Sequence, residues 1–124
     1  LFDAYIKPYI KVLLAILNNN RDSNTGKVNL SNQEIVEKIK EEYSNKEVLY
    51  LTESKGRYVS SWLNIMRDDY GFVDFKPRNN TRVVKYDPFN LSKDDLIQKI
   101  KEQPIAKQYC EKFYELLRNG DFNN

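Results

Sequence analysis

The sequence predicts a mainly helical α+β domain that carries one small antiparallel β-hairpin. Apolar residues recur at helical spacing, serines with helix-capping spacing stand at positions 31 and 92, and two short apolar runs flank a polar turn at residues 76–81. A length of 124 residues and a hydrophobic fraction of 40% suit one core. We expect the main unit at residues 1–90, with residues 91–124 as a helical extension of the same domain.

The first half of the chain predicts two helices joined through a short strand. The first apolar stripe consists of Ile6, Ile10, Leu13, Leu14 and Leu17. After the polar loop 18–26, residues 27–30 alternate and predict a small strand. Ser31 and Glu34 have the spacing of a capping box and open a second helix, followed by a short apolar connection at residues 47–51. The buried stripe of this second helix is expected to be Ile35, Val36, Ile39 and Tyr43.

The middle of the chain predicts a third helix and then the hairpin. Ser54 is expected to cap a helix over residues 55–69, and Gly71 is expected to end it. The core face of this helix is expected to hold Val59, Trp62, Leu63 and Met66. Residues 72–75 and 82–86 predict the two strands, and the basic segment between them is rich in turn-forming residues.

Two further helices are predicted near the C-terminus. Ser92 and Asp95 repeat the capping spacing, and Pro104 separates that helix from the last one. The first helix carries Leu96, Ile97 and Ile100, and the last carries Ile105, Tyr109, Phe113, Leu116 and Leu117. The last stripe either completes the monomer core or pairs with a second copy, and we favour a homodimer through the C-terminal helices.

Composition excludes several classes of protein. The chain has no histidine, which removes the commonest general base, and its single Cys110 provides neither an internal disulfide nor a zinc site. The longest apolar run, residues 12–17, is far shorter than the roughly 20 residues that span a bilayer. We therefore expect a cytoplasmic protein that needs no cofactor, holds no metal and does not bind a membrane.

One short motif invites an enzymatic interpretation. Glu53, Ser54 and Lys55 match the Glu-x-Lys half of a metal-dependent nuclease site. That motif belongs on a strand beside an aspartate of a neighbouring strand, whereas this copy lies at a predicted helix start. Asp68 and Asp69 are better explained as a solvated helix end. We interpret the match as coincidence and expect no catalytic residues and no enzyme activity.

The order of the elements resembles the winged helix-turn-helix superfamily of DNA-binding domains over residues 5–86. The segment GRYVSSWLNIMRDDYGFV at residues 56–73 resembles the recognition helix and first wing strand of that superfamily. The pattern is also distantly similar to the winged-helix recognition modules of type II restriction or nicking endonucleases, which precede a separate cleavage domain. The resemblance implies that the third helix enters the major groove and that the wing contacts the backbone or the minor groove.

The DNA-binding candidates follow from the face of the third helix that lies opposite its core stripe. At about 100° per residue this face holds Ser54, Arg57, Ser61, Asn64 and Asp68, with Ser60 and Arg67 beside it. Arg57 and Asn64 are the best base-reading candidates, because arginine pairs with guanine and asparagine with adenine. The full candidate set is Ser54, Lys55, Arg57, Ser60, Ser61, Asn64 and Arg67 on the helix, with Lys76, Arg78, Asn79, Asn80 and Arg82 in the wing.

Charge is concentrated in the same region. Residues 55–86 contain seven cations and three anions and carry +4, so the rest of the chain carries −2 of the total of +2. The cations are Lys55, Arg57, Arg67, Lys76, Arg78, Arg82 and Lys85, and the anions are Asp68, Asp69 and Asp74. Cations on one surface act together on phosphates, which favours a nucleic-acid partner.

We therefore expect binding to double-stranded DNA, as a bacterial or phage transcription regulator or as a target-recognition module of a restriction-modification system. The sequence leaves open a replication initiator, a restriction endonuclease recognition domain and a winged helix that binds only protein. Salt dependence separates the last of these from the others. The chain opens on Leu1 in a helical pattern, as a piece of a larger protein would.

Overall fold

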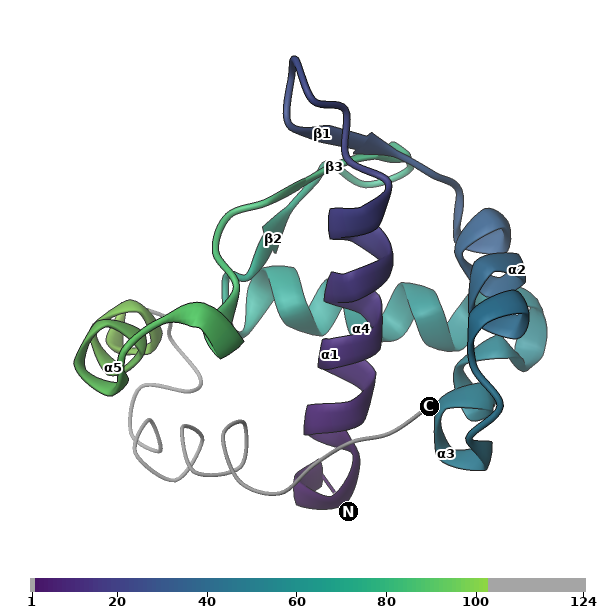
Figure 1. The fold of residues 1–124 in the computed structure, drawn as a ribbon, viewed down its shortest axis with the longest axis horizontal. Coiled ribbons are helices and arrows are strands. Elements are labelled where there is room, and N and C mark those ends of the chain that lie inside the picture. The colour runs from purple at the N-terminus through teal and green to yellow at the C-terminus, as the bar shows by residue number, and fades with distance from the viewer. Residues whose placement is uncertain (1, 103–124) are drawn as a thin grey trace.

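The computed structural model describes residues 2–102, with side chains from residue 8 onward. This part of the chain is mainly helical and holds one small antiparallel sheet, which confirms the predicted α+β class (Figure 1). Its helices and strands are α1 (Phe2–Asn19), β1 (Lys27–Asn29), α2 (Asn32–Glu42), α3 (Lys46–Leu49), α4 (Arg57–Asp68), β2 (Val73–Asp74), β3 (Thr81–Val84) and α5 (Lys93–Lys101). Three short 3₁₀ turns complete it, η1 (Tyr50–Thr52), η2 (Ser54–Gly56) and η3 (Pro88–Asn90).

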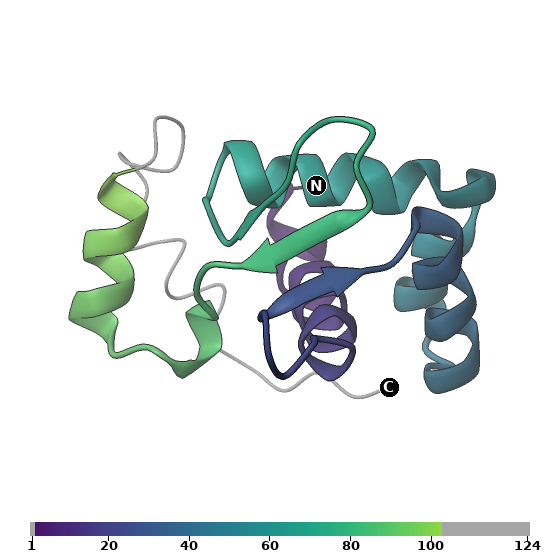
Figure 2. The same ribbon diagram turned by 90° about the horizontal axis from the view of Figure 1, so that it is seen from above.

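The sheet joins the strand that precedes α2 to the hairpin that follows α4. Its order is β1-β3-β2, and both pairings are antiparallel. Val28 of β1 faces Arg82 of β3, and Val73 of β2 faces Val84 of β3. The predicted hairpin therefore gains the short first strand as a third member, and β3 is the central strand. Figure 2 shows β1 and β3 side by side and running in opposite directions.

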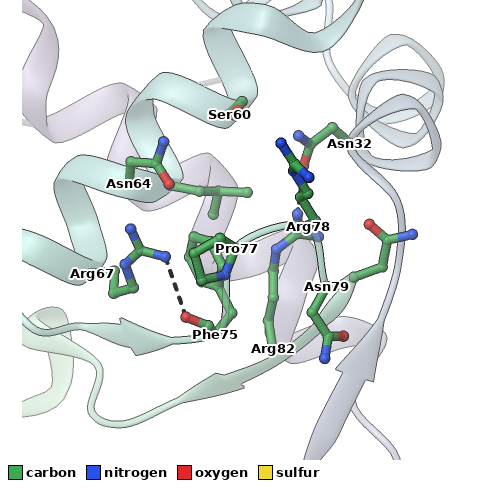
Figure 3. Close-up of a pocket in the computed structure, with 11 residues that line it drawn as sticks. Asn32, Ser60, Asn64, Arg67, Phe75, Pro77, Arg78, Asn79 and Arg82 are labelled. Carbon is green, nitrogen blue, oxygen red and sulfur yellow. Dashed lines mark hydrogen bonds between the residues drawn. The ribbon is translucent and has the colours of Figure 1, made fainter.

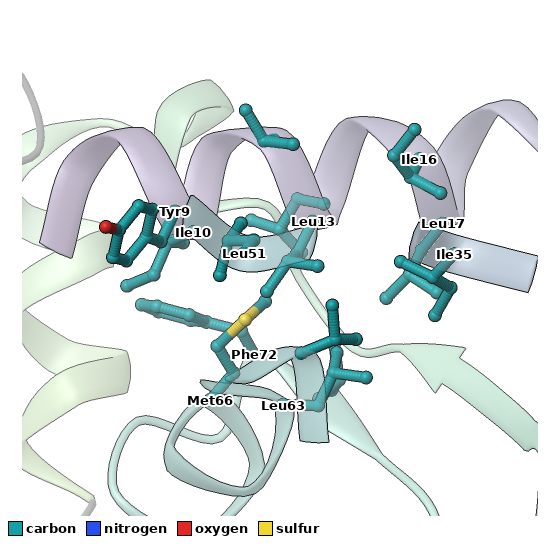
Figure 4. Packing of buried hydrophobic residues seen from close by; sticks show 14 of the residues in the cluster. Tyr9, Ile10, Leu13, Ile16, Leu17, Ile35, Leu51, Leu63, Met66 and Phe72 are labelled. Atoms are coloured by element: carbon teal, nitrogen blue, oxygen red, sulfur yellow. The ribbon is translucent and has the colours of Figure 1, made fainter. Parts of the chain in front are cut away.

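The core lies between α1, α4 and the sheet. Ile10, Leu13 and Leu17 of α1 are fully buried, as are Met66 of α4 and Phe72 at the start of the hairpin (Figure 4). Each such side chain contributes roughly 1.5–3 kcal/mol of burial free energy. This packing fixes the inner face of α4 against α1 and so presents its opposite face outward.

The start of α2 is built as the sequence predicts. The Glu34 backbone N–H donates to the Ser31 hydroxyl over 3.1 Å, and the Ser31 N–H donates to the Glu34 carboxylate over 3.0 Å. The hydrogen bond from the Ser31 backbone N–H lowers the pKa of the Glu34 carboxyl group. Ile35 and Ile39 are buried, whereas Tyr43 ends the helix and is only half-buried. The predicted capping box is confirmed.

The connection between α2 and α4 is more helical than predicted. Residues 47–51 were expected to form a plain apolar connection, but α3 and η1 occupy this segment. Asn45 caps α3 by accepting the Glu47 N–H over 2.8 Å. Val48 and Leu51 point into the core with no exposed surface. The segment is too short for helical periodicity to be visible in the sequence, which is why the expectation was wrong.

The start of α4 also differs from the prediction. Ser54 and Lys55 have left-handed φ values of 58° and 55°, and Gly56 follows with a φ of 87°. The helix therefore begins at Arg57, two residues later than predicted, and Ser54 makes no capping hydrogen bond. Val59, Leu63 and Met66 are buried as expected. Trp62 is half-buried, and its ring packs edge-on against Tyr9 with 5.2 Å between the ring centroids.

Gly56 fixes the approach of α4 to the start of α2, and its substitution tests that turn. A Cβ added to Gly56 would lie 3.4 Å from the Asn32 Cβ, on a backbone with a φ of 87°. We expect Gly56→Ala to cost about 1–2 kcal/mol of unfolding free energy, because a side chain is strained at this φ. Urea denaturation measures this. Gly26→Ala is the matched control, since that glycine has a φ of 72° and open space around it. Because the two φ values are similar, an equal cost for both would assign the loss to backbone conformation, whereas a larger cost at Gly56 would assign the excess to its contact with Asn32. An unchanged stability of Gly56→Ala would contradict the prediction.

The end of α4 is set by Gly71. Its φ of 70° lets the Phe72 N–H close back onto the Met66 carbonyl over 2.9 Å. The two hairpin strands, β2 and β3, are shorter than the predicted residues 72–75 and 82–86.

Only the first of the two C-terminal helices can be compared with its prediction. In α5, Ser92 accepts the Asp95 N–H over 3.2 Å, and Leu96 and Ile100 are buried. The predicted last helix and its dimerisation stripe lie outside the described residues. Within residues 2–102, none of the helices has the length and apolar character that crossing a membrane requires.

Candidate nucleic-acid interface

The outward face of α4 carries the polar residues expected there. Arg57, Ser61, Asn64 and Asp68 are all exposed, on the side opposite the buried stripe. Ser60 and Arg67 are half-buried and line the pocket described below. Two other candidates, Ser54 and Lys55, are exposed but lie in η2, ahead of the helix.

The wing is the loop at residues 75–80 between β2 and β3. It turns through a hydrogen bond from the Asn79 N–H to the Lys76 carbonyl, 3.1 Å long. The Thr81 N–H then donates to the Asn79 side-chain oxygen over 2.8 Å. Arg78 has a left-handed φ of 62°, which is uncommon for a residue with a side chain. Residues 76–80 are exposed throughout, so four of the five wing candidates face solvent.

A pocket of about 370 Å³ separates α4 from the wing (Figure 3). It is lined by Ser60, Leu63, Asn64 and Arg67 of α4, by Phe75, Pro77, Arg78, Asn79 and Asn80 of the wing, and by Asn32 and Arg82. Three of these residues are arginines and none is an aspartate or glutamate. A concave surface lined by charges of one sign focuses the potential and attracts anions.

Arg82 was expected to contact DNA, and the structure corrects this. Its side chain is only 4% exposed and forms part of the core between β3 and α2. The guanidinium donates to the Leu30 carbonyl and, over 2.6 Å, to the Asn32 side-chain oxygen. It also lies 5.3 Å from the centre of the Phe75 ring, and burial lowers its pKa. The alternation of the central strand β3 turns this cation inward, which the basic pattern of the loop concealed.

Arg67 is held by contacts within the protein. Its Nε and one Nη donate to the two Asp68 carboxylate oxygens over 2.7 and 3.1 Å. The other Nη donates to the Phe75 carbonyl over 3.2 Å, and the guanidinium stacks 4.4 Å from the Phe75 ring centre. The hydrogen bond from Arg67 lowers the pKa of Asp68. Arg67 therefore fixes the wing to α4 and neutralises Asp68, a role that the sequence did not reveal.

The remaining pocket residues leave several polar groups available. Within residues 2–102, the side chains of Ser60, Asn64, Arg78 and Asn80 make no hydrogen bond or ion pair, although all four line the pocket. Asn32 is the polar pocket residue that sequence reasoning missed, beside the apolar Leu63, Phe75 and Pro77. It is 50 residues from its partner Arg82, and no local pattern joins two positions so far apart.

The nuclease-like Glu-x-Lys motif lies in the turn that precedes α4. Glu53 directly precedes η2 and Lys55 lies within it, so neither residue is on a strand. Among the described side chains, no group of three His, Cys, Asp or Glu residues is placed to hold a metal ion. Comparison with protein-family models, curated proteins and solved structures finds no match for the chain.

Proposed function

We propose that the chain is a winged helix-turn-helix domain that binds double-stranded DNA, with α4 in the major groove and the wing on the adjacent backbone or minor groove. One observation carries the proposal. The exposed face of α4 and the wing border the same pocket, whose lining includes no carboxylate and in which Arg78 is an exposed cation without an ion pair among the described residues. Phosphate contacts supply most of the affinity of such proteins for DNA.

The topology supports the same proposal. A strand between the first two helices pairs with the second strand of a hairpin that follows the helix proposed to read DNA. This pairing fixes the hairpin beside α4, as a wing requires. The α4 helix is long enough to place several side chains in a groove. The residues of its inner face, Val59, Leu63 and Met66, are buried in the core.

The exposed residues divide into two proposed roles. Asn64, in the middle of the outward face of α4, and Arg57, at its first turn, have the chemistry to contact base edges. Lys76, Arg78 and Asn80 of the wing contact phosphates, which position the domain on the duplex without reading sequence.

Fluorescence anisotropy with a mixed-sequence duplex at two salt concentrations tests the proposal. Several phosphate contacts predict an affinity that falls steeply as salt rises. Salt-sensitive binding would justify selecting a preferred site from random duplexes. The absence of binding at low salt would contradict the proposal and favour a protein partner for this surface.

Replacing Asp68 is predicted to strengthen DNA binding, whereas removing a cation of the same surface should weaken it. Its carboxylate is exposed on the outward face of α4, and the hydrogen bond from Arg67 lowers its pKa. We expect Asp68→Asn to raise DNA affinity several-fold at low salt, because it removes repulsion from phosphates and leaves the charge of Arg67 unbalanced. Glu41→Gln on α2 changes the net charge equally and is the control. Equal gains in both variants would mean that net charge alone acts, and that α4 does not face DNA.

A further inference from the structure

The proposed docking determines which part of the DNA lies next to the pocket. If α4 occupies the major groove and the wing reaches the adjacent minor groove, the sugar-phosphate strand that separates these grooves must pass between them. The pocket lies at this place, bordered by α4 on one side and the wing on the other (Figure 3). The chemical groups that line the pocket therefore indicate which part of that DNA strand would bind there.

The side-chain amides of Asn32 and Asn79 have their NH₂ groups available as hydrogen-bond donors. Arg82 donates to the side-chain oxygen of Asn32 over 2.6 Å, so the remaining polar group of that amide is its NH₂. The Thr81 N–H occupies the side-chain oxygen of Asn79 in the same way, over 2.8 Å. Neither NH₂ group has a hydrogen-bond partner among the described residues. The side-chain oxygens of Asn32 and Asn79 thus accept hydrogen bonds within the protein, while their NH₂ groups are available to a ligand that accepts hydrogen bonds.

The charge of the pocket favours the same kind of ligand. Arg78 is exposed and makes no hydrogen bond or ion pair within residues 2–102, and Figure 3 shows it on the same side of the pocket as Asn32. Buried Arg82 lies beneath them, and its Nε has no partner among the described residues. Arg67 adds little net charge, because Asp68 balances it. Pro77 adds exposed apolar surface suited to a sugar.

We propose that the pocket holds one backbone phosphate of the DNA strand that separates the two grooves. Asn32 and Arg78 donate to its oxygens, and Arg82 is a positioning residue that orients the Asn32 amide. The inference rests on the proposed function. It adds Asn32, at the start of α2, to the DNA interface, although Asn32 belongs to neither α4 nor the wing.

Two substitutions at Asn32 separate its contact with DNA from its contact with Arg82. Asn32→Asp keeps an oxygen for Arg82 and replaces the donor with a carboxylate that repels phosphate, whereas Asn32→Ala removes both groups. We expect Asn32→Asp to fold normally and to bind duplex DNA at least tenfold more weakly than the wild type. Thermal unfolding of both variants identifies any loss that comes from the fold.

Single neutral methylphosphonates, placed one at a time along a selected duplex, locate the phosphate. At one or two neighbouring positions we expect the wild type to lose roughly tenfold in affinity. Arg78→Ala and Asn32→Ala should lose clearly less there, because their interaction with that phosphate is already absent. Asn64→Ala is the matched control within the pocket, and it should keep the full sensitivity while changing sequence preference.

Three outcomes would overturn the inference. If the variants and the wild type respond equally at every methylphosphonate, no phosphate occupies the pocket, although the domain still binds DNA. If inorganic phosphate shifts the Asn32 side-chain amide signals in NMR while the methylphosphonate scan is flat, the site takes free phosphate. If the wild type binds no duplex at low salt, the proposed function fails first and the inference with it.

Discussion

Replacing Arg82 of β3 with alanine is expected to destabilise the protein by roughly 3 kcal/mol, far more than the same change at a cation of the wing. The substitution leaves the buried Leu30 carbonyl and the Asn32 side-chain oxygen without their donor and opens a cavity beside Phe75. Hydrogen bonds to a charged group contribute about 1.5–3 kcal/mol, and a lost buried side chain adds to that. Urea denaturation followed by Trp62 fluorescence measures the change, together with a fall in Tm of roughly 10 °C or more.

Arg78→Ala is the matched control, because it removes the same side chain from the same hairpin. Arg78 is exposed and makes no hydrogen bond within the described residues, so its loss should change stability by less than about 0.5 kcal/mol. Arg82→Met keeps most of the side-chain volume and separates the lost hydrogen bonds from the cavity. If Arg82→Ala were as stable as Arg78→Ala, the guanidinium would not belong to the core.

These two arginines show where the sequence predicts a site well and where it does not. The inward and outward faces of α4 could be predicted, because the period of a helix is visible in twelve consecutive residues. The wing could be predicted as a loop from its turn-forming residues. Which of its cations points inward depends on the register of β3, where Arg82 pairs with Val28, and on Leu30 and Asn32, some fifty positions away.

Other differences have the same physical origin. The backbone of Ser54 and Lys55 adopts the left-handed region, which no propensity for serine or lysine would favour, and this delays α4 until Arg57. The pairing of Arg67 with Asp68 was equally hidden, because adjacent residues on a helix usually point apart. Here the wing supplies the Phe75 ring and carbonyl that hold the Arg67 guanidinium in place. Local patterns predict elements, whereas contacts between elements decide which charges remain available.

Removing Arg57 and Arg78 together is expected to weaken DNA binding by roughly a hundredfold at low salt without unfolding the domain. Both side chains are exposed and neither belongs to the core. Each contributes one cation to the proposed surface, so the slope of log affinity against log salt should fall by about one for each phosphate that is no longer neutralised. Because Arg57 lies on α4 and Arg78 on the wing, we expect the two effects to add.

A double variant of equal charge distinguishes a defined surface from general attraction. Lys11 of α1 and Lys46 of α3 are exposed and lie outside both α4 and the wing. Lys11→Ala with Lys46→Ala should therefore lower affinity only slightly, through net charge, and should keep the salt slope of the wild type. Equal weakening in the two double variants would contradict a specific face. Unchanged affinity after the removal of Arg57 and Arg78 would exclude α4 and the wing as the DNA-binding surface.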